Sequence, residues 1–127
     1  MTRTAIKTTH APGAVAAYSQ AIDTGQIVFL AGQIGLDPAT GTIVEGGIDA
    51  QSERVMQNLT AVLAAAGLTF EDVAKTTCFL SDIANFDAFN AVYARFMPDP
   101  PPARSTFAVA GLPRGALIEV EAIAARR

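Results

Sequence analysis

One stretch of the chain repeats its apolar residues at helical spacing. In residues 49–66 the apolar side chains fall three or four positions apart, which places them on one face of a helix. These side chains are Val55, Leu59, Val62, Leu63 and Ala66. We expect Asp49 to cap the start of this helix and Gly67, in a left-handed conformation, to end it.

A second helix is predicted over residues 85–97. Phe86, Phe89, Tyr93 and Phe96 form one aromatic stripe along it. The helix cannot continue past residue 97, because Pro98 lacks an N–H group and clashes with the preceding turn.

Shorter runs rich in β-branched and aromatic residues predict strands. The stronger candidates are residues 27–31, 75–80, 104–110 and 117–125, and the weaker ones are residues 4–9 and 21–24. This order of elements is typical of an α+β fold, in which two helices cover one face of a single mixed sheet. Residues 98–102 form a stiff, proline-rich connection, and no linker or repeat divides the chain. Residues 1–127 are therefore expected to form one domain.

The composition narrows the class of function. Half of the 127 residues are hydrophobic and 17% are charged, as in folded globular domains. A net charge of -3 and nine scattered basic residues disfavour nucleic-acid binding. No apolar run approaches the length that spans a bilayer, and residues 1–7 lack the apolar core of a signal peptide, so a cytoplasmic location without membrane contact is expected.

Cofactor and metal chemistry have no sequence support. The chain has one cysteine, Cys78, and one histidine, His10, which are far apart in sequence and cannot make a disulfide or a zinc cluster by themselves. Phosphate-binding, dinucleotide-binding and serine-hydrolase motifs are missing as well. We therefore expect no cofactor and no metal, and we interpret Cys78 as a small hydrophobic strand residue.

The last two predicted strands have one face of mixed character. We expect residues 104–110 and 117–125 to pair as a hairpin across the turn-rich residues 111–115. One face, under the helices, would carry Phe107, Val109, Ile118, Val120 and Ala122. The opposite face would then carry Arg104, Thr106, Ala108, Ala110, Leu117, Glu119, Glu121 and Ile123. This second face is too apolar for water and too charged for a core, so we expect another copy of the chain to cover it.

Two charged residues on that face are candidates for chemistry. The guanidinium of Arg104, at a strand end, suits a carboxylate held by two parallel hydrogen bonds, but an ordinary ion pair with Glu119 or Glu121 explains it equally well. Aliphatic neighbours can raise the pKa of Glu119 towards neutrality and fit it for proton transfer with water. Glu121 competes for that role, and most strand glutamates are simply solvated or paired.

Three further residues are candidates for the site, each with a structural alternative. The Tyr18 hydroxyl can orient a ligand, although tyrosines more often belong to a core. Gly32 lets a ligand approach the backbone closely, although a tight turn also explains a glycine there. Asn90 interrupts the aromatic stripe of the second helix and needs polar partners if it is buried.

Taken together, several segments resemble the RidA/YjgF family in content and order. They are Ala17-Tyr18-Ser19-Gln20-Ala21, Phe29-Leu30-Ala31-Gly32-Gln33-Ile34-Gly35, Asp37-Pro38-Ala39-Thr40-Gly41, Lys75-Thr76-Thr77-Cys78-Phe79-Leu80, Pro102-Ala103-Arg104-Ser105 and Ile118-Glu119-Val120-Glu121-Ala122-Ile123-Ala124. The resemblance covers nearly the whole chain. It implies a chorismate-mutase-like α+β domain that assembles as a homotrimer around a central barrel, with active sites between subunits.

The resemblance also implies roles for individual residues. Arg104 would hold the substrate carboxylate, Glu119 would position or activate water, and Tyr18 would line the pocket. The backbone at Gly32 would contact the substrate, and Asn90 would support the site. Two departures from the family pattern concern the pocket: Thr106, expected in its wall, stands where many members have cysteine, and Ala17 stands where proline is common.

The activity implied is hydrolysis of reactive 2-imino acids or enamines, such as 2-iminobutanoate and 2-iminopropanoate, to 2-keto acids and ammonia. Two alternatives remain at this point. One is a pathway-specific deaminase for aminoacrylate or aminomuconate. The other is a non-catalytic trimer that binds ligands, acts like a chaperone or inhibits translation through RNA. The acidic balance disfavours RNA, and Arg104 disfavours a pure scaffold.

Overall fold

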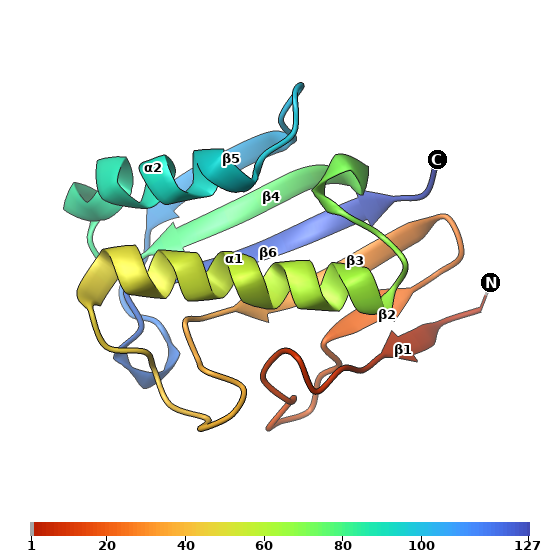
Figure 1. Ribbon diagram of the computed structural model, residues 1–127, viewed down its shortest axis with the longest axis horizontal. Coiled ribbons are helices and arrows are strands. Elements are labelled where there is room, and N and C mark those ends of the chain that lie inside the picture. The colour runs from red at the N-terminus through yellow and green to blue at the C-terminus, as the bar shows by residue number, and fades with distance from the viewer. Residues whose placement is uncertain (1) are drawn as a thin grey trace.

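The computed structural model describes residues 2–127 and contains one six-stranded sheet. Met1, the first residue of the expected domain, lies outside the described residues. The strands are β1 (Thr4–Ile6), β2 (Ala21–Asp23), β3 (Ile27–Gln33), β4 (Val73–Leu80), β5 (Ala103–Ala108) and β6 (Ile118–Ala125). Their order across the sheet is β1-β2-β3-β6-β4-β5 (Figure 1). All six predicted strands are confirmed, with bounds shifted by a few residues.

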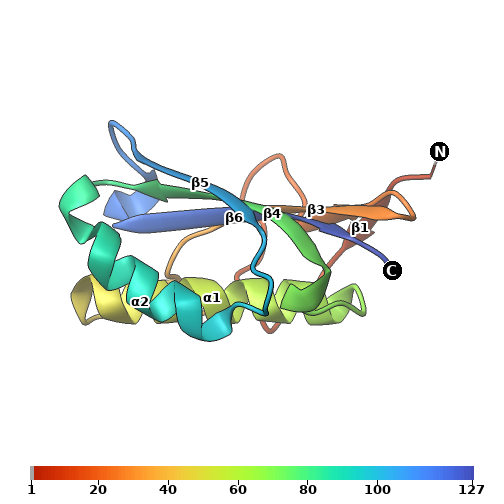
Figure 2. The same ribbon diagram turned by 90° about the horizontal axis from the view of Figure 1, so that it is seen from above.

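Both helices lie on the same face of the sheet, as Figure 2 shows from above. They are α1 (Gly47–Ala65) and α2 (Phe86–Phe96), so the predicted mixed sheet with two helices on one face is confirmed. Neither helix within residues 2–127 has the length and apolar character needed to cross a membrane.

The ends of α1 follow the sequence prediction only in part. Gly67 has a φ of +75°, so the predicted left-handed residue after the helix is confirmed. The predicted N-cap is wrong: Gly46, with a φ of 116°, precedes the first turn, and Asp49 lies within that turn. An acidic side chain there still interacts favourably with the positive end of the helix dipole, which explains the same local sequence signal.

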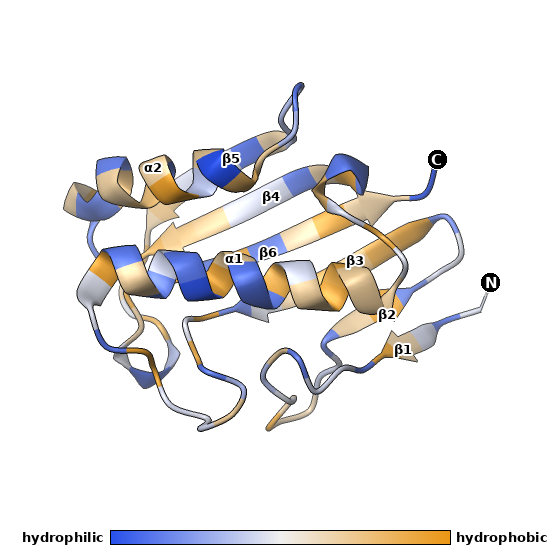
Figure 3. Cartoon of the chain, in the orientation of Figure 1, coloured by the Kyte–Doolittle hydropathy of each residue, from blue (hydrophilic) through white to orange (hydrophobic). Residues whose placement is uncertain are grey.

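The core lies between the helices and the sheet. Along α1, hydrophobic and hydrophilic bands alternate in Figure 3, as expected for a helix with one buried face. The largest fully buried apolar side chains are Phe89, Met56, Leu59, Leu63, Leu80, Ile118, Val28, Val55, Val62 and Val120. The aromatic stripe of α2 contributes Phe89 and Tyr93 to this core and leaves Phe86 and Phe96 half-buried at its margin.

The predicted hairpin between the last two strands is wrong. Strand β5 pairs only with β4, in parallel, and β4 separates it from β6. The reason is the β4-α2-β5 connection: a helix that crosses back over the sheet returns the chain parallel to the strand it left. The turn-rich residues 111–115 therefore join two strands that are not neighbours.

The same pairing corrects the faces assigned to β5. Phe107 is in register with Phe79, which is in register with Glu119, so these three side chains share the face that no helix covers. Arg104 is in register with the buried Thr76 and lies on the helix side. The prediction that Arg104 and Glu119 share a face is wrong, whereas the placement of Ile118, Val120 and Ala122 under the helices is confirmed by their burial.

The uncovered face has the mixed character that the sequence predicted. Phe29 and Phe107 are 48% and 46% exposed, and Glu121 is exposed among them. Phe107 packs edge-on against Phe79, with ring centroids 5.4 Å apart. An aromatic and aliphatic surface of this kind is typical of a face that another chain covers.

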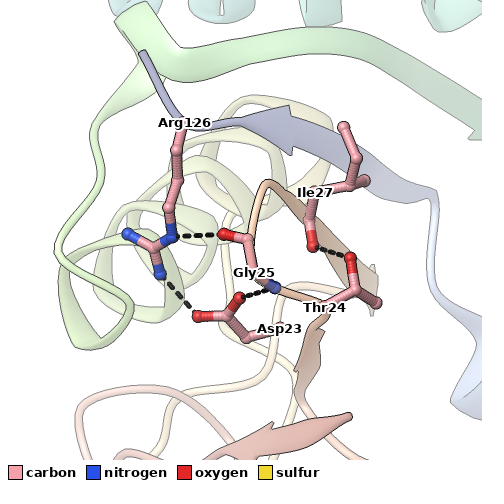
Figure 4. Close-up of polar contacts among 5 residues, drawn as sticks. All are labelled: Asp23, Thr24, Gly25, Ile27 and Arg126. Carbon is pink, nitrogen blue, oxygen red and sulfur yellow. Dashed lines mark hydrogen bonds and ion pairs between the residues drawn. The ribbon is translucent and has the colours of Figure 1, made fainter. Parts of the chain in front are cut away.

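Strand β6 is tied to the β2–β3 turn by Arg126 (Figure 4). The Arg126 Nε donates to the carbonyl of Gly25 over 2.9 Å, and its Nη2 pairs with the carboxylate of Asp23. The same carboxylate accepts a 2.8 Å hydrogen bond from the Gly25 amide. The Gly25 amide and then the guanidinium hold the pKa of Asp23 below its ordinary value.

The contacts of Arg126 with Asp23 and Gly25 predict a pH-dependent effect of Arg126→Gln. The depressed pKa of Asp23 means that its contribution to stability is complete above the unfolded-state pKa of about 4 and is lost as pH falls through the folded-state pKa. Urea unfolding should show Arg126→Gln less stable than wild type at pH 7, and the difference should shrink below about pH 4. A difference that stays constant from pH 7 to pH 3 would contradict the assignment.

Candidate functional site

Three of the predicted site residues line one cleft. They are Tyr18, from the loop before β2, Gly32 at the end of β3, and Glu119 on β6. The rest of this first cleft is mainly apolar and is formed by Pro12, Gly13, Val15, Ala31, Gln33, Ile34, Leu36, Pro113 and Arg114. The first cleft therefore combines one acidic side chain with walls suited to a small, partly apolar molecule.

Gly32 brings its backbone directly against the Glu119 side chain. The register between β3 and β6 shifts between Leu30 and Gln33, and Gly32 lies within this irregularity. A Cβ atom on Gly32 would lie 2.0 Å from Glu119 Oε2, where no real Cβ atom fits. The group that lies against Gly32 within this chain is the carboxyl of Glu119. The predicted approach of a ligand to this backbone stays a prediction.

The carboxyl of Glu119 is suited to proton transfer. The side chain is half-buried, and this burial raises its pKa, because the charged form loses hydration. Glu121, on the same face, raises the pKa further through like-charge repulsion. Glu121 itself is exposed, so the structure favours Glu119 over Glu121 as the acid or base.

Arg104 lies in a second cleft, where helix α2 fixes its side chain. Its Nη1 donates to Asn90 Oδ1 over 2.8 Å. Its guanidinium carbon lies 4.6 Å from the centroid of the Tyr93 ring and 5.4 Å from that of Phe86. The second cleft is formed by Asn90, Tyr93, Ala94, Met97, Pro98, Pro101, Pro102 and Arg104.

These contacts leave several N–H donors of the Arg104 guanidinium without a partner in the described residues. A guanidinium carries five N–H donors, and Asn90 accepts from one side of it, while the aromatic rings contact its faces. Within residues 2–127 Arg104 forms no ion pair, so the cross-strand pair with Glu119 or Glu121 is not made. The remaining donors suit a planar carboxylate.

Thr106 lies beside Cys78 and lines neither cleft. The two residues are in register on the helix side of the sheet, and the Thr106 hydroxyl is buried without a hydrogen-bond partner in the described part of the chain. Burial raises the pKa of Cys78 to about 11, so its sulfur is a neutral thiol at neutral pH. The interpretation of Cys78 as a buried hydrophobic strand residue is confirmed.

Some residues around the clefts were not predicted as site residues from the sequence. Tyr93 and Phe86 were assigned only to the core stripe, yet both contact the guanidinium of Arg104. Arg114, in the turn after β5, lines the first cleft with a φ of 58°, and its Nη1 donates to the Gly41 carbonyl over 2.8 Å. The residues Pro113 and Gly115 around it signalled a turn but not its position at a cleft.

The predicted site residues, except Thr106, are thus divided between two clefts. Tyr18, Gly32 and Glu119 belong to the first cleft, whereas Asn90 and Arg104 belong to the second. Glu119 and Arg104 project from opposite faces of the sheet. In residues 2–127 no three His, Cys, Asp or Glu side chains gather as metal ligands would.

Known proteins resemble this chain over nearly its full length. The family model described as Endoribonuclease L-PSP matches residues 8–126. Protein DfrA of Myxococcus xanthus is 52% identical over 98% of this chain and 96% of its own length. The 2-iminobutanoate/2-iminopropanoate deaminase of Mus musculus is 42% identical over 96% of this chain and 90% of its own.

Solved structures agree with these sequence matches. RidA from an Antarctic Psychrobacter superposes with a TM-score of 0.94 at 40% identity, covering 98% of this chain and 100% of that chain. Escherichia coli TdcF with bound serine superposes with a TM-score of 0.92 at 39% identity, covering 98% of this chain and 99% of that chain. The family-model match, the sequence identities and the shared fold confirm the resemblance found in the motifs. The chain belongs to the Endoribonuclease L-PSP family, which includes RidA and YjgF.

Proposed function

We propose that the protein hydrolyses small 2-imino acids, such as 2-iminobutanoate and 2-iminopropanoate, and their enamine tautomers, to 2-keto acids and ammonia. The observation that carries this proposal is the pair of half-sites, one with a fixed guanidinium and the other with a carboxyl of raised pKa. The name of the mouse relative supports the same substrates. The serine bound in TdcF supports a site for a small amino-acid-like molecule.

In this mechanism Arg104 binds the substrate carboxylate through two parallel hydrogen bonds. Ionised Glu119 positions a water molecule and accepts a proton from it as the oxygen attacks the electrophilic imine carbon. Glu119 then returns this proton to the nitrogen, which gives a carbinolamine. The same carboxylate next takes the hydroxyl proton and passes it to the amino nitrogen, so that the C–N bond breaks, ammonia leaves and the C=O bond forms. Because the imine is already reactive, orientation and one proton carrier are sufficient for catalysis.

The complete site requires a second copy of the chain, because Arg104 and Glu119 lie on opposite faces of one protomer. We therefore place the site between protomers of a homotrimer, in which the uncovered sheet faces line a central barrel. The exposed aromatic residues of that face, Phe29 and Phe107, support such burial. The cytoplasmic location expected from the sequence is part of the same proposal.

Other substrates and roles remain as alternatives to this proposal. A pathway-specific enamine, aminoacrylate or aminomuconate, would use the same half-sites. The name of the family model points to RNA cleavage. A net charge of -3 with nine basic residues gives no support to phosphate binding, and the apolar walls of the first cleft favour a small organic substrate.

The proposal predicts that Arg104 and Glu119 are both required for activity. With 2-iminobutanoate generated in situ, Glu119→Gln should lower kcat by roughly 10²- to 10⁴-fold, because the proton carrier is lost. Arg104→Lys keeps the charge but not the two parallel hydrogen bonds, so it should recover only part of the loss seen in Arg104→Ala. Keto-acid release, corrected for spontaneous hydrolysis, measures both effects, and equal rates in all variants would refute the chemistry.

Mixing the two inactive variants tests whether the site lies between protomers. If Arg104→Ala and Glu119→Gln chains are refolded together at equal amounts, random assembly gives about a quarter of the sites both intact residues. Activity should therefore return to about a quarter of the wild-type value. No recovery, despite mixed assembly verified by mass spectrometry, would place both residues in a site made by one chain.

The raised pKa of Glu119 predicts the acid limb of the pH profile. The base form is required, so kcat/KM should fall as pH drops through a pKa above that of an ordinary glutamate. Glu121→Gln removes the like charge and should move this limb to lower pH without abolishing activity. An acid limb at the same pH in wild type and Glu121→Gln would show that another group controls it.

Gly32→Ala should separate activity from stability. The added Cβ meets the flexible end of the Glu119 side chain, which can swing away at little structural cost, but the carboxyl then leaves its position. We expect a loss of roughly 10²-fold in kcat with nearly unchanged thermal unfolding. Gly111→Ala is the matched control, because a Cβ there meets nothing within 4 Å and Gly111 lines neither cleft. Equal activity in the two variants would contradict the role of this contact.

A further inference from the structure

Three buried carboxamide side chains lie behind the walls of the first cleft. Gln20, Gln51 and Asn58 are only 4%, 7% and 0% exposed. A buried amide is unfavourable unless its hydrogen bonds are satisfied, and each of the three bonds backbone groups of a loop or of a strand end. They therefore fix the path of the main chain as well as filling space.

Gln20 fastens the loop that precedes β2. Its Oε1 accepts from the Thr8 amide over 2.8 Å, and its Nε2 donates to the carbonyls of Thr8 and Pro12 over 3.1 and 2.8 Å. A longer contact of 3.3 Å reaches the Ala11 carbonyl. Residues 7–20 contain no helix or strand, so this side chain replaces the ladder that would otherwise hold the backbone.

Asn58 holds a second part of the lining of the first cleft in place. From helix α1 its Nδ2 donates to the carbonyls of Ile34 and Leu36 over 3.2 and 3.0 Å. Its Oδ1 accepts from Arg54 Nε over 2.9 Å. Gln51, on the same helix, accepts from the Leu117 amide over 2.9 Å, at the entry to β6.

The backbone held by these amides forms the first cleft. Pro12, Ile34 and Leu36 line it, and Leu117 lies two residues before Glu119. The main-chain carbonyl of Gln20 also accepts from the amide of Ala31, the residue before Gly32. Gln20 thus connects the Pro12 wall, the segment that carries Tyr18 and the strand that carries Gly32.

We propose that Gln20 and Asn58 are positioning residues, whose carboxamides hold two parts of the lining of the first cleft in the positions that place the imine against Glu119. This inference rests on the proposed function. Neither side chain touches the substrate. Their effect is on the orientation of the bound molecule, and an error of about 1 Å in such an orientation can cost roughly 10²-fold in rate.

Two variants remove the hydrogen bonds between these carboxamides and the backbone, with little change in side-chain shape. Gln20→Met keeps the length of the side chain and loses its hydrogen bonds. Asn58→Asp keeps the Arg54 contact as an ion pair but can no longer donate to Ile34 and Leu36. Thr69→Ala is the control. The substitution removes the capping hydrogen bond that the Thr69 hydroxyl accepts from the Glu71 amide, at the short 3₁₀ turn after α1, and Thr69 lines neither cleft.

Steady-state kinetics with 2-iminobutanoate, below the unfolding temperature of each variant, give the decisive measurement. Gln20→Met and Asn58→Asp should lower kcat by ten- to a hundredfold, and KM should stay within about threefold because Arg104 binds from the other half-site. Thr69→Ala should lower the unfolding temperature and leave kcat unchanged. Amide hydrogen exchange should be faster at residues 8–11 in Gln20→Met only.

The outcomes separate this inference from the proposed function. If wild type accelerates hydrolysis and both variants match Thr69→Ala in kcat, the inference is overturned and the proposed function stands. If wild type does not accelerate hydrolysis, both are overturned. Should Gln20→Met fail to fold, Asn58→Asp decides alone, since its pairing with Arg54 preserves the helix contact.

Discussion

The alternation of side chains across the sheet is the constraint on which both the core and the half-sites depend. Successive residues of β6 send Ile118 and Val120 under the helices and leave Glu119 on the uncovered face. The same rule on β5 turns Arg104 towards α2. A protomer that buries its core in this way cannot bring its cation and its acid together, and assembly becomes a condition of the chemistry proposed for it.

The two charged groups meet different physical demands. Arg104 remains charged next to aromatic rings and an amide oxygen, which orient a guanidinium without neutralising it. Glu119 lies where hydration is incomplete and Glu121 is near, so the cost of its charge is raised. Binding an anion needs the first environment, and exchanging a proton with water near neutral pH needs the second.

The sequence was most informative where structure is local. Periodicity located both helices, runs of β-branched and aromatic residues located all six strands, and the glycine after α1 marked its end. The prediction that β5 pairs with β6 failed, because a parallel crossover leaves no local signal in the sequence and a turn-rich connection resembles a hairpin. Most of the site came from family motifs, which name residues without distributing them between clefts. Gln20 and Asn58 escaped notice because their partners are backbone groups 8 to 24 positions away, which no side-chain pattern reveals.

The central place of β6 in the sheet has a consequence for folding. This strand lies between β3 and β4, so the β1-β2-β3 and β4-β5 portions meet only through it. Until β6 takes its place, no hydrogen bonds join these two portions of the sheet, and the helices lack Ile118 and Val120 to pack against. Completion of the single sheet and of its core therefore requires β6, and a chain truncated before this strand would leave apolar surface uncovered.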